Sequence, residues 1–263
     1  MDIYSCLSSV REKSPLIHHL TNWVTIYDCA QVVKSFGGSP VMAHAVEEVE
    51  DMVLLASALV VNIGTLTSEF IESAKRAAAA ANRKNIPVVL DVCGAGATPF
   101  RDSKSMELLE ETRIDIIKGN ASEIARVAGY MVQTKGVDSS DVQEDLIDIA
   151  ATLASARSCT VVITGKRDVV ADRSKIYTVE NGNDMMSQVV GTGCMAASVI
   201  GTFAGANPDD YTFAAAAGLS CFEIAAEMAV KTAGGPGTFR GHLLDSVSNL
   251  TEEVITTMQK VQS

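Results

Sequence analysis

The sequence predicts an α/β fold in which helices flank both faces of a mostly parallel central sheet. Short, largely apolar runs, as at 58–63 and 160–164, are typical of strands that are buried on both faces. Helical stretches alternate with these runs along most of the chain, which is the pattern of parallel strands joined by helical crossovers. Because no internal repeat, low-complexity tail or linker interrupts this pattern, we expect a single domain over residues 1–263.

The expected elements follow from periodicity and from the residues that start and stop helices. Pro15 ends a first amphipathic helix, and Thr21 and Asn22 are suitable N-cap residues for the helix after the first strand. We expect strands over 16–20, 58–63, 86–91, 114–118 and 160–164. We expect helices over 3–12, 23–36, 47–57, 70–85, 101–113, 121–128 and 142–157.

The segment from 168 to 179 departs from this alternation. Two short β runs, Val169–Ala171 and Ile176–Val179, flank a polar turn, which predicts an antiparallel hairpin at the sheet edge. A polar loop over 180–187 follows the hairpin. The rest of the chain is expected to be helical, with a glycine-rich break before the last helix, over 195–203, 211–231 and 239–260.

Charge and cysteine usage exclude several classes of function. A net charge of −11 and an isoelectric point near 4.8 disfavour nucleic acid or an anionic membrane as partner, because both require a basic face. The N-terminus lacks the pattern of a secretory signal and the apolar runs are too short to span a bilayer, so we expect a cytoplasmic protein. The six cysteines include no C-x-x-C pair and indicate neither a disulfide framework nor a zinc site.

The most informative stretch is Gly191-Thr192-Gly193-Cys194, which opens an Ala-rich apolar helix. Glycine permits a tight turn, and the first N–H groups of a helix have no acceptor within that helix. Together with the helix dipole, these groups form a site for a phosphate or for a developing negative charge. Cys194 is expected in the first helical turn, at this anion site.

Polar residues also collect where the predicted parallel strands end, at the edge where open α/β folds bind ligands. Asp91 and Glu123 are placed to support Mg²⁺, but an acid is equally expected at a helix N-terminus or as a loop cap. Lys118 could face a phosphate and Thr164 a nucleotide. A solvated lysine and an ordinary turn account for these two residues equally well.

Three other kinds of site are disfavoured. The chain has no G-x-x-x-x-G-K-[ST] run, which excludes a P-loop as far as a motif can. The stretch at Gly191 matches the loose G-x-G-x-x-A dinucleotide pattern, but a second helix follows where that fingerprint requires a strand ending in an acid. His18 and His19 are adjacent on a strand and point to opposite faces, so they do not suit one metal ion.

Several segments, taken in order, resemble the hydroxyethylthiazole kinase family, whose members have a ribokinase-like fold. The resemblance extends from about His19 to Asp245, and each piece that carries it is weak alone but distinctive in this order and spacing. The pieces are Thr21-Asn22-Trp23-Val24-Thr25, Ser39-Pro40-Val41-Met42-Ala43, Leu59-Val60-Val61-Asn62-Ile63-Gly64-Thr65-Leu66, Lys118-Gly119-Asn120-Ala121-Ser122-Glu123-Ile124 and Gly191-Thr192-Gly193-Cys194. Two positions depart from the usual pattern. Val92-Cys93 stands where the family has Pro-Val, and Lys118 stands where it often has Arg.

The resemblance implies an enzyme of thiamine biosynthesis and salvage that uses ATP and Mg²⁺ to phosphorylate the hydroxyl of 4-methyl-5-(2-hydroxyethyl)thiazole. It also implies a homotrimer with active sites between subunits and with no separate lid domain. The implied ATP contacts are Lys118, Asn120 and Thr164, and the implied supports for Mg²⁺ are Asp91 and Glu123. The implied substrate pocket comprises Asn22, Val24, Met42, Gly64 and Gly191, and the implied catalytic anion site comprises Gly191, Thr192, Gly193 and Cys194.

Two alternatives stay open at this point. One is another small-alcohol kinase of the same superfold, such as a hydroxymethylpyrimidine or pyridoxal kinase, and the other is a non-catalytic nucleotide- or dinucleotide-binding module. In a kinase, positioning and charge stabilisation supply most of the catalysis, so the helix N-terminus should matter more than a strong base. Whether Cys194 takes the hydroxyl proton or only lies in the anion site is likewise open.

Overall fold

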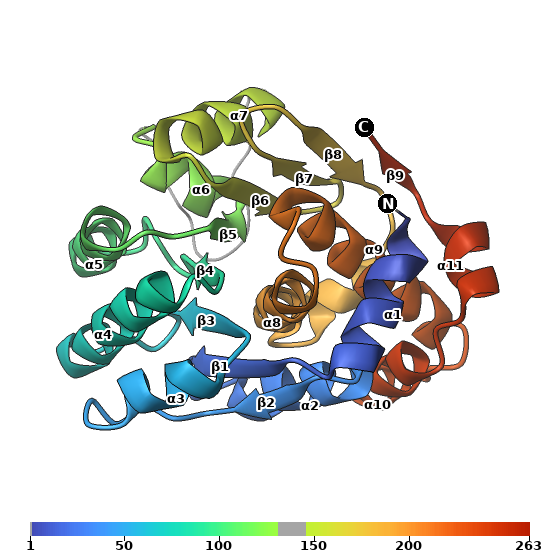
Figure 1. The fold of residues 1–263 in the computed structure, drawn as a ribbon. Coiled ribbons are helices and arrows are strands. Elements are labelled where there is room, and N and C mark those ends of the chain that lie inside the picture. Colours follow the sequence, from blue (N-terminus) through green and yellow to red (C-terminus); the bar gives the residue numbers. More distant parts are fainter. Residues whose placement is uncertain (1, 131–145) are drawn as a thin grey trace.

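The computed structural model describes residues 2–130 and 146–263, and it confirms the α/β architecture (Figure 1). Within these residues one sheet has nine strands in the order β2-β1-β3-β4-β5-β6-β7-β8-β9. The strands from β2 to β6 pair in parallel, whereas β7, β8 and β9 are joined by antiparallel pairings. The bounds are β1 Leu16–Leu20, β2 Ser39–Val41, β3 Ala58–Asn62, β4 Val88–Asp91, β5 Ile116–Asn120, β6 Thr160–Thr164, β7 Asp168–Ala171, β8 Ile176–Val179 and β9 Val261–Gln262.

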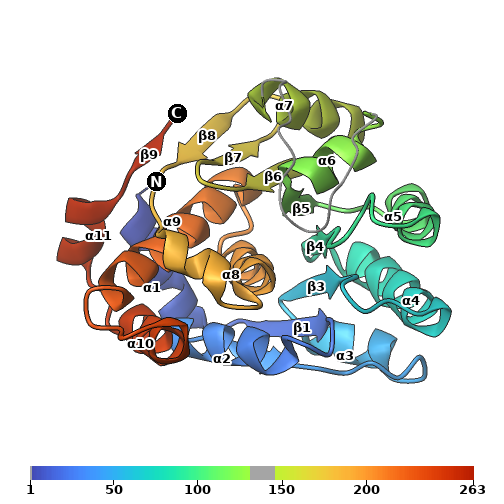
Figure 2. The ribbon, with the colours of Figure 1, turned by 180° about the vertical axis from the view of Figure 1, so that it is seen from behind.

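Helices cover both faces of this sheet, as Figures 1 and 2 show. The helices α3 to α7 lie on one face, and α1, α2 and α8 to α11 lie on the other. Their bounds are α1 Ile3–Lys13, α2 Ile26–Phe36, α3 Val49–Leu55, α4 Ser68–Lys84, α5 Pro99–Glu111, α6 Ala121–Val127, α7 Leu146–Arg157, α8 Thr192–Ala206, α9 Tyr211–Ala229, α10 Pro236–Ser248 and α11 Glu252–Met258. A short 3₁₀ helix, Asp184–Gln188, precedes α8.

The two faces bury separate apolar clusters, because successive side chains of a strand point to opposite sides. Leu59 and Val61 of β3 join the cluster that contains α4, whereas Val60 between them joins the cluster that contains α8. A Cβ at Gly201 of α8 would lie 2.3 Å from a methyl group of Val60, so glycine is what allows α8 to approach β3 this closely. The close contact seats α8 over the middle of the parallel strands.

The long apolar helix α9 packs beside α8 in the same cluster. By length and composition alone, α9 could cross a membrane. However, 83% of the segment is buried inside the protein, which is what we expect of a central core helix.

Some of the expected helix and strand boundaries within residues 21–41 are wrong. The helix expected from residue 23 begins at Ile26 instead, because the Asn22 side chain does not cap it. The Oδ1 of Asn22 accepts hydrogen bonds from the N–H groups of Val24 and Thr25, and this closes a turn ahead of the helix. No strand was expected between residues 36 and 47, but Ser39–Val41 forms the parallel edge strand β2.

The C-terminal part also differs from expectation. The helix expected over 239–260 breaks after Ser248, and the Thr251 side chain caps a separate helix, α11. The chain then pairs as β9 with β8, so the predicted hairpin of β7 and β8 is correct but does not form the sheet edge. The helix expected over 142–157 is described from Leu146 onward, and its earlier residues lie outside the described residues.

Candidate functional site

The first turn of α8 faces the carboxyl ends of the parallel strands. Gly191 is its N-cap, with a left-handed φ of 98°. A Cβ at this position would lie 2.6 Å from the Cγ2 of Thr25, so both backbone conformation and space require glycine. The N–H groups of residues 192–194 have no acceptor within the helix, which is the geometry expected of an anion site.

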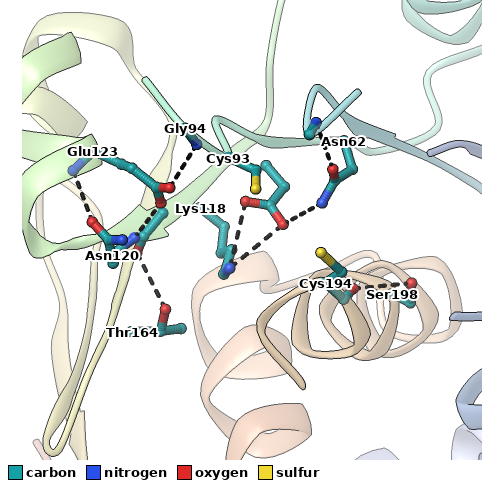
Figure 3. A network of polar contacts seen from close by, with 12 residues as sticks. Asn62, Cys93, Gly94, Lys118, Asn120, Glu123, Thr164, Cys194 and Ser198 are labelled. Carbon is teal, nitrogen blue, oxygen red and sulfur yellow. Dashed lines mark hydrogen bonds and ion pairs between the residues drawn. The ribbon is translucent and has the colours of Figure 1, made fainter. Parts of the chain in front are cut away.

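A chain of side-chain hydrogen bonds joins this turn to the ends of β3 and β4, and part of it is drawn in Figure 3. Asn22 donates to the Sγ of Cys194 at 3.3 Å and to the Oδ1 of Asn62 at 3.0 Å. Asn62 in turn donates to the Oδ2 of Asp91 at 2.6 Å. The N–H of Gly64 donates to the Oδ1 of Asn62 at 2.9 Å, which fixes the orientation of that amide. The thiol of α8 and the carboxylate of β4 are therefore linked through two oriented amides.

Lys118 of β5 and Asp91 form a buried ion pair within this network. The Nζ of Lys118 lies 3.4 Å from each carboxylate oxygen, and the two side chains are 5% and 1% exposed. The same Nζ lies 3.4 Å from the place that a Cβ on Gly193 would occupy. Lys118 therefore brings a positive charge to the first turn of α8.

Burial and the ion pair act in opposite directions on these two groups. Burial raises the pKa of the Asp91 carboxyl, while the positive charge of Lys118 opposes that rise. Burial lowers the pKa of Lys118, but the carboxylates of Asp91 and Glu123 outweigh burial and hold that pKa above its ordinary value. Lys118 consequently stays charged over the whole neutral range.

Glu123 is held by backbone N–H groups from two loops. Its Oε1 accepts from Gly94 at 2.7 Å, and its Oε2 accepts from Asn120 at 2.8 Å. The N–H of Glu123 donates back to the Oδ1 of Asn120 at 2.9 Å, which completes a capping box at the start of α6. The helix-terminal interpretation of Glu123 is therefore correct. It does not exclude a metal, because each carboxylate oxygen retains a further lone pair.

Two cavities meet at the first turn of α8. The Cys194 pocket, of about 490 Å³, extends toward the loops after β3 and β4. The Asp168 pocket, of about 520 Å³, lies between the turn before β7, the loop after β8 and helix α9. The residues at the junction line both cavities and include Asn120, Thr164, Thr192 and Gly193.

Cys93 adds a second free thiol to the wall of the Cys194 pocket (Figure 3). The neighbouring Cys93 thiol is the main cause that lowers the pKa of Cys194 to about 5, against the effect of burial and with help from Lys118. The same interaction raises the pKa of the Cys93 thiol far above its ordinary value. The interaction between the two thiols therefore favours the thiolate form of Cys194 and the protonated form of Cys93.

The structure brings together all but one of the residues that the sequence singled out. The Cys194 pocket is lined by Asn22, Val24, Gly64, Asp91, Lys118, Asn120, Glu123, Thr164, Gly191, Thr192, Gly193 and Cys194. Met42 lines neither cavity and lies just beyond β2. The Thr192 hydroxyl donates to the Met186 carbonyl at 2.9 Å, so it is the backbone N–H of Thr192 that faces the anion site. The roles of all these residues stay predictions.

Sequence reasoning overlooked Arg101 and gave no role to Asn62 or Cys93. Arg101 donates to the carbonyl oxygens of Ile63 at 2.9 Å, Gly64 at 2.7 Å and Cys93 at 3.0 Å. It thus holds the loop after β3 to the loop after β4. No local signal marks Arg101, because its partners are backbone atoms from distant segments. Asn62 was expected beside the site as a polar residue that ends a buried apolar strand, but no contact was assigned to it.

Known proteins resemble this chain over nearly its whole length. Residues 7–253 match the sequence model of the hydroxyethylthiazole kinase family. The chain is 53% identical over 256 residues to a hydroxyethylthiazole kinase of Methanosarcina mazei, covering 97% of this chain and 98% of that protein. It is 43% identical over 267 residues to one of Clostridium beijerinckii, covering 99% and 96%.

Solved structures give the same result. A hydroxyethylthiazole kinase from Pyrococcus horikoshii OT3 is 39% identical, with a TM-score of 0.91 over 99% of this chain and 98% of that one. A ribokinase-like superfamily protein from Enterococcus faecalis V583 is 16% identical, with a TM-score of 0.65 over 92% and 88%. At that identity the second likeness shows the fold alone.

Proposed function

Because the chain belongs to the hydroxyethylthiazole kinase family, we propose that it transfers the γ-phosphoryl group of ATP to the hydroxyl of 4-methyl-5-(2-hydroxyethyl)thiazole. The observation that carries this proposal is the meeting of the two cavities at the first turn of α8. An alcohol in the Cys194 pocket and a nucleotide in the Asp168 pocket would bring hydroxyl and γ-phosphate together at residues 191–194. The product would serve thiamine biosynthesis or salvage, in the cytoplasm.

In this proposal the chain contributes positioning and positive charge. In-line transfer spreads negative charge over the oxygens of the moving phosphoryl group. The N–H groups of residues 192–194 meet that charge from one side, and the Nζ of Lys118 meets it from another. Asn120 and Thr164, at the junction of the cavities, are proposed to contact the phosphates of ATP. Such donors are oriented before the reaction and therefore cost no reorganisation during it.

Asp91 and Glu123 fit a supporting role for Mg²⁺. Among the described residues, no group of three or more His, Cys, Asp or Glu side chains could hold a metal ion. Mg²⁺ usually binds through one or two carboxylates, water and substrate phosphates, and Asp91 and Glu123 would supply two such carboxylates. Bound Mg²⁺ would supply charge neutralisation at the β- and γ-phosphates. Glu123 retains lone pairs toward the Cys194 pocket, and Asp91, already engaged by Asn62 and Lys118, would act through water.

Replacement of Glu123 by glutamine is expected to raise the Mg²⁺ concentration for half-maximal activity by about tenfold or more. The amide oxygen of glutamine can keep the capping-box bond from the Asn120 N–H, but the bond from the Gly94 N–H is lost, so thermal unfolding must verify that the variant is folded. The measurement is a magnesium titration at saturating ATP, with Glu252→Gln in the first turn of α11 as the control. A titration curve identical to that of the unaltered enzyme would rule out a metal role for Glu123.

Replacement of Cys194 by serine is expected to lower kcat by less than about tenfold, because we assign the main stabilisation to the helix N-terminus. Loss of a dominant general base would cost about 10²–10⁴. A pKa of about 5 means that Cys194 is already deprotonated at neutral pH, so a base role would show as activity that rises with pH near 5 and then levels off. A loss of two or more orders of magnitude for Cys194→Ser, with partial recovery in Cys194→Asp, would instead establish Cys194 as the base.

An ADP-release assay with purified enzyme and MgATP tests the function itself. The thiazole alcohol is expected to be turned over, and hydroxymethylpyrimidine and pyridoxal are expected to give at most trace rates. If either of those alcohols were phosphorylated with a higher kcat/KM than the thiazole alcohol, that alcohol would be the preferred substrate. ATP binding without turnover of any alcohol would favour the non-catalytic alternative.

We also propose a homotrimer with active sites between subunits. Two exposed apolar side chains, Val24 and Val190, line the Cys194 pocket, and two more, Trp23 and Tyr27, lie close to Val24 in the sequence; Val190 is 73% exposed. A patch of this kind beside a ligand pocket is typical of a subunit interface. Met42, which lines neither cavity of one chain, would contribute to the Cys194 pocket of a neighbouring subunit.

Light scattering after gel filtration tests this assembly, with an expected mass of three times the 27.7 kDa of one chain. Val190→Asp is expected to shift the protein to smaller species and to reduce its activity. Ile176→Glu, at an exposed apolar position on β8, serves as the control and should leave the mass unchanged. An unaltered protein that runs as a monomer at full activity would refute the proposed interface.

A further inference from the structure

The Asp168 pocket contains two buried carboxyl groups to which the proposed transfer gives no role. Asp168 begins β7 and Glu223 lies on α9, and the two residues are 2% and 7% exposed. Both line the cavity beside the apolar side chains of Met186, Leu219 and Phe222. Buried carboxyl groups are costly, so their presence in a cavity wall calls for a reason.

Each carboxyl group keeps one oxygen without a hydrogen-bond partner outside the pair. The Oδ1 of Asp168 accepts from the Gly165 N–H at 2.8 Å, whereas no donor from another described residue reaches Oδ2 of Asp168 or Oε2 of Glu223, and the two carboxyl groups interact with each other. Burial raises the pKa of Asp168 to about 6 and also raises the pKa of Glu223, to which the neighbouring Asp168 adds. A proton on Glu223 would let it donate to Asp168, and the pair would still retain vacant acceptor sites.

Helix α9 carries a second carboxylate, Glu227, whose hydrogen bonds contrast with those of Glu223. The Oε1 of Glu227, one turn after Glu223, accepts from Asn181 at 3.1 Å, from the Gly182 N–H at 3.0 Å and from Lys260 at 3.0 Å. Glu227 therefore holds the loop after β8 to the core. The carboxyl carbon of Glu223 would lie 3.6 Å from a Cβ on Gly182, so the absence of a side chain there leaves space beside that carboxyl group.

The surroundings limit what can bind at this end of the cavity. Two carboxyl groups repel a phosphate, and no metal-binding cluster is present among the residues that the structure describes. Leu219 and Phe222 offer apolar surface to a flat ring, while the two carboxyl groups offer acceptor oxygens to a hydrogen-bond donor. A cavity of about 520 Å³ can hold a nucleotide whose phosphates reach the first turn of α8.

We propose that Asp168 and Glu223 accept hydrogen bonds from the nucleoside part of ATP, either from the amino group of adenine or from the hydroxyl groups of ribose. This inference rests on the proposed function, because it takes the Asp168 pocket as the ATP site. The pair then selects the nucleotide independently of the phosphate contacts at residues 191–194.

Calorimetric titration of the full chain with ADP, IDP, 2′-deoxyADP and 3′-deoxyADP tests the inference without turnover. ADP is expected to bind at least about tenfold more tightly than the analogue that lacks the recognised donor. If IDP binds more weakly than ADP, the adenine amino group is the recognised donor. If a deoxy analogue binds more weakly, the missing ribose hydroxyl is the recognised donor. Equal affinity for all four nucleotides, or no binding of ADP, would overturn the inference. Selective ADP binding without phosphorylation of the thiazole alcohol would overturn the proposed function and leave this inference standing.

Variants assign the selectivity to the pair. Glu223→Leu is expected to reduce the preference for ADP several-fold and to raise the KM for ATP more than it lowers kcat. Asp168→Asn keeps the acceptor oxygen for the Gly165 N–H and places an NH2 donor in place of Oδ2. It should therefore also lower the affinity for ADP relative to the analogue that lacks the recognised donor. Glu227→Gln is the matched control and should retain the selectivity of the unaltered protein. Thermal unfolding verifies that each variant is folded, and full selectivity in both folded pocket variants would refute the assignment.

Discussion

Replacement of Lys118 by methionine is expected to lower kcat/KM by about 10²–10³, the usual loss when one oriented donor to a developing charge is removed. The Nζ of Lys118 lies beside the first turn of α8 and is held there by both oxygens of Asp91. Methionine has a similar shape without the charge. Steady-state kinetics with MgATP and the thiazole alcohol provide the measurement.

The same replacement also affects folding, and this effect has to be separated from catalysis. Removing one partner of a buried ion pair costs about 3–5 kcal/mol. The cost is reduced because Lys118 lowers the pKa of Asp91, so removal of Lys118 lets burial raise that pKa further and favours a protonated carboxyl group over an unpaired buried charge. The double variant Lys118→Met/Asp91→Asn should therefore regain stability in denaturant unfolding and remain inactive.

Lys118→Arg is the positive control, since it keeps the charge and the chain length at a position where the family often has arginine. We expect it to retain most of the activity. If the double variant recovered both stability and activity, Lys118 would be a structural partner of Asp91 and the charge at the helix N-terminus would come from elsewhere.

Replacement of Gly191 by alanine is expected to lower kcat by about 10² or more, because it moves the N–H groups that form the anion site. Alanine disfavours the left-handed φ of 98°, and its Cβ would meet Thr25 at 2.6 Å. The backbone must shift to relieve this contact. Crystallography or amide chemical shifts for residues 192–194 would reveal the shift, and initial rates would give its catalytic effect.

Gly241→Ala within α10 is the matched control for this glycine. No atom lies within 4 Å of the place its Cβ would take, so the change should leave activity intact and stabilise the helix slightly. Wild-type kcat in a folded Gly191→Ala enzyme would show that the position of these N–H groups does not limit phosphoryl transfer.

The arrangement of the parallel sheet could be predicted from the sequence, because buried strands such as β3 and β6 read as apolar runs between helices. The positions of Asp91 and Lys118 at neighbouring strand ends followed from that arrangement. The hydrogen-bond chain through Asn22 and Asn62 could not be predicted, since amide orientation depends on backbone groups that only the fold brings near.

The failures have a common physical cause. Asn22 carries the signature of a helix cap, but its side chain closes the turn before α2 and donates into the site. The family motif gave no hint of the thiol pair, because Cys93 departs from that motif and meets Cys194 only in the folded chain. In both cases the role of the side chain depends on a contact with a distant segment, which the local sequence does not reveal.

Arg101 makes the two loops that line the Cys194 pocket rigid. Its guanidinium donates hydrogen bonds to the carbonyl oxygens of Ile63, Gly64 and Cys93. The N–H groups of Gly64 and Gly94 donate to the buried side chains of Asn62 and Glu123. Loops after strands ordinarily open on their own, far below the free energy of global unfolding. These two loops are fastened to each other and to the core, so their amide protons should exchange with solvent as slowly as those of the strands they follow. The walls of the Cys194 pocket would then keep their shape between turnovers.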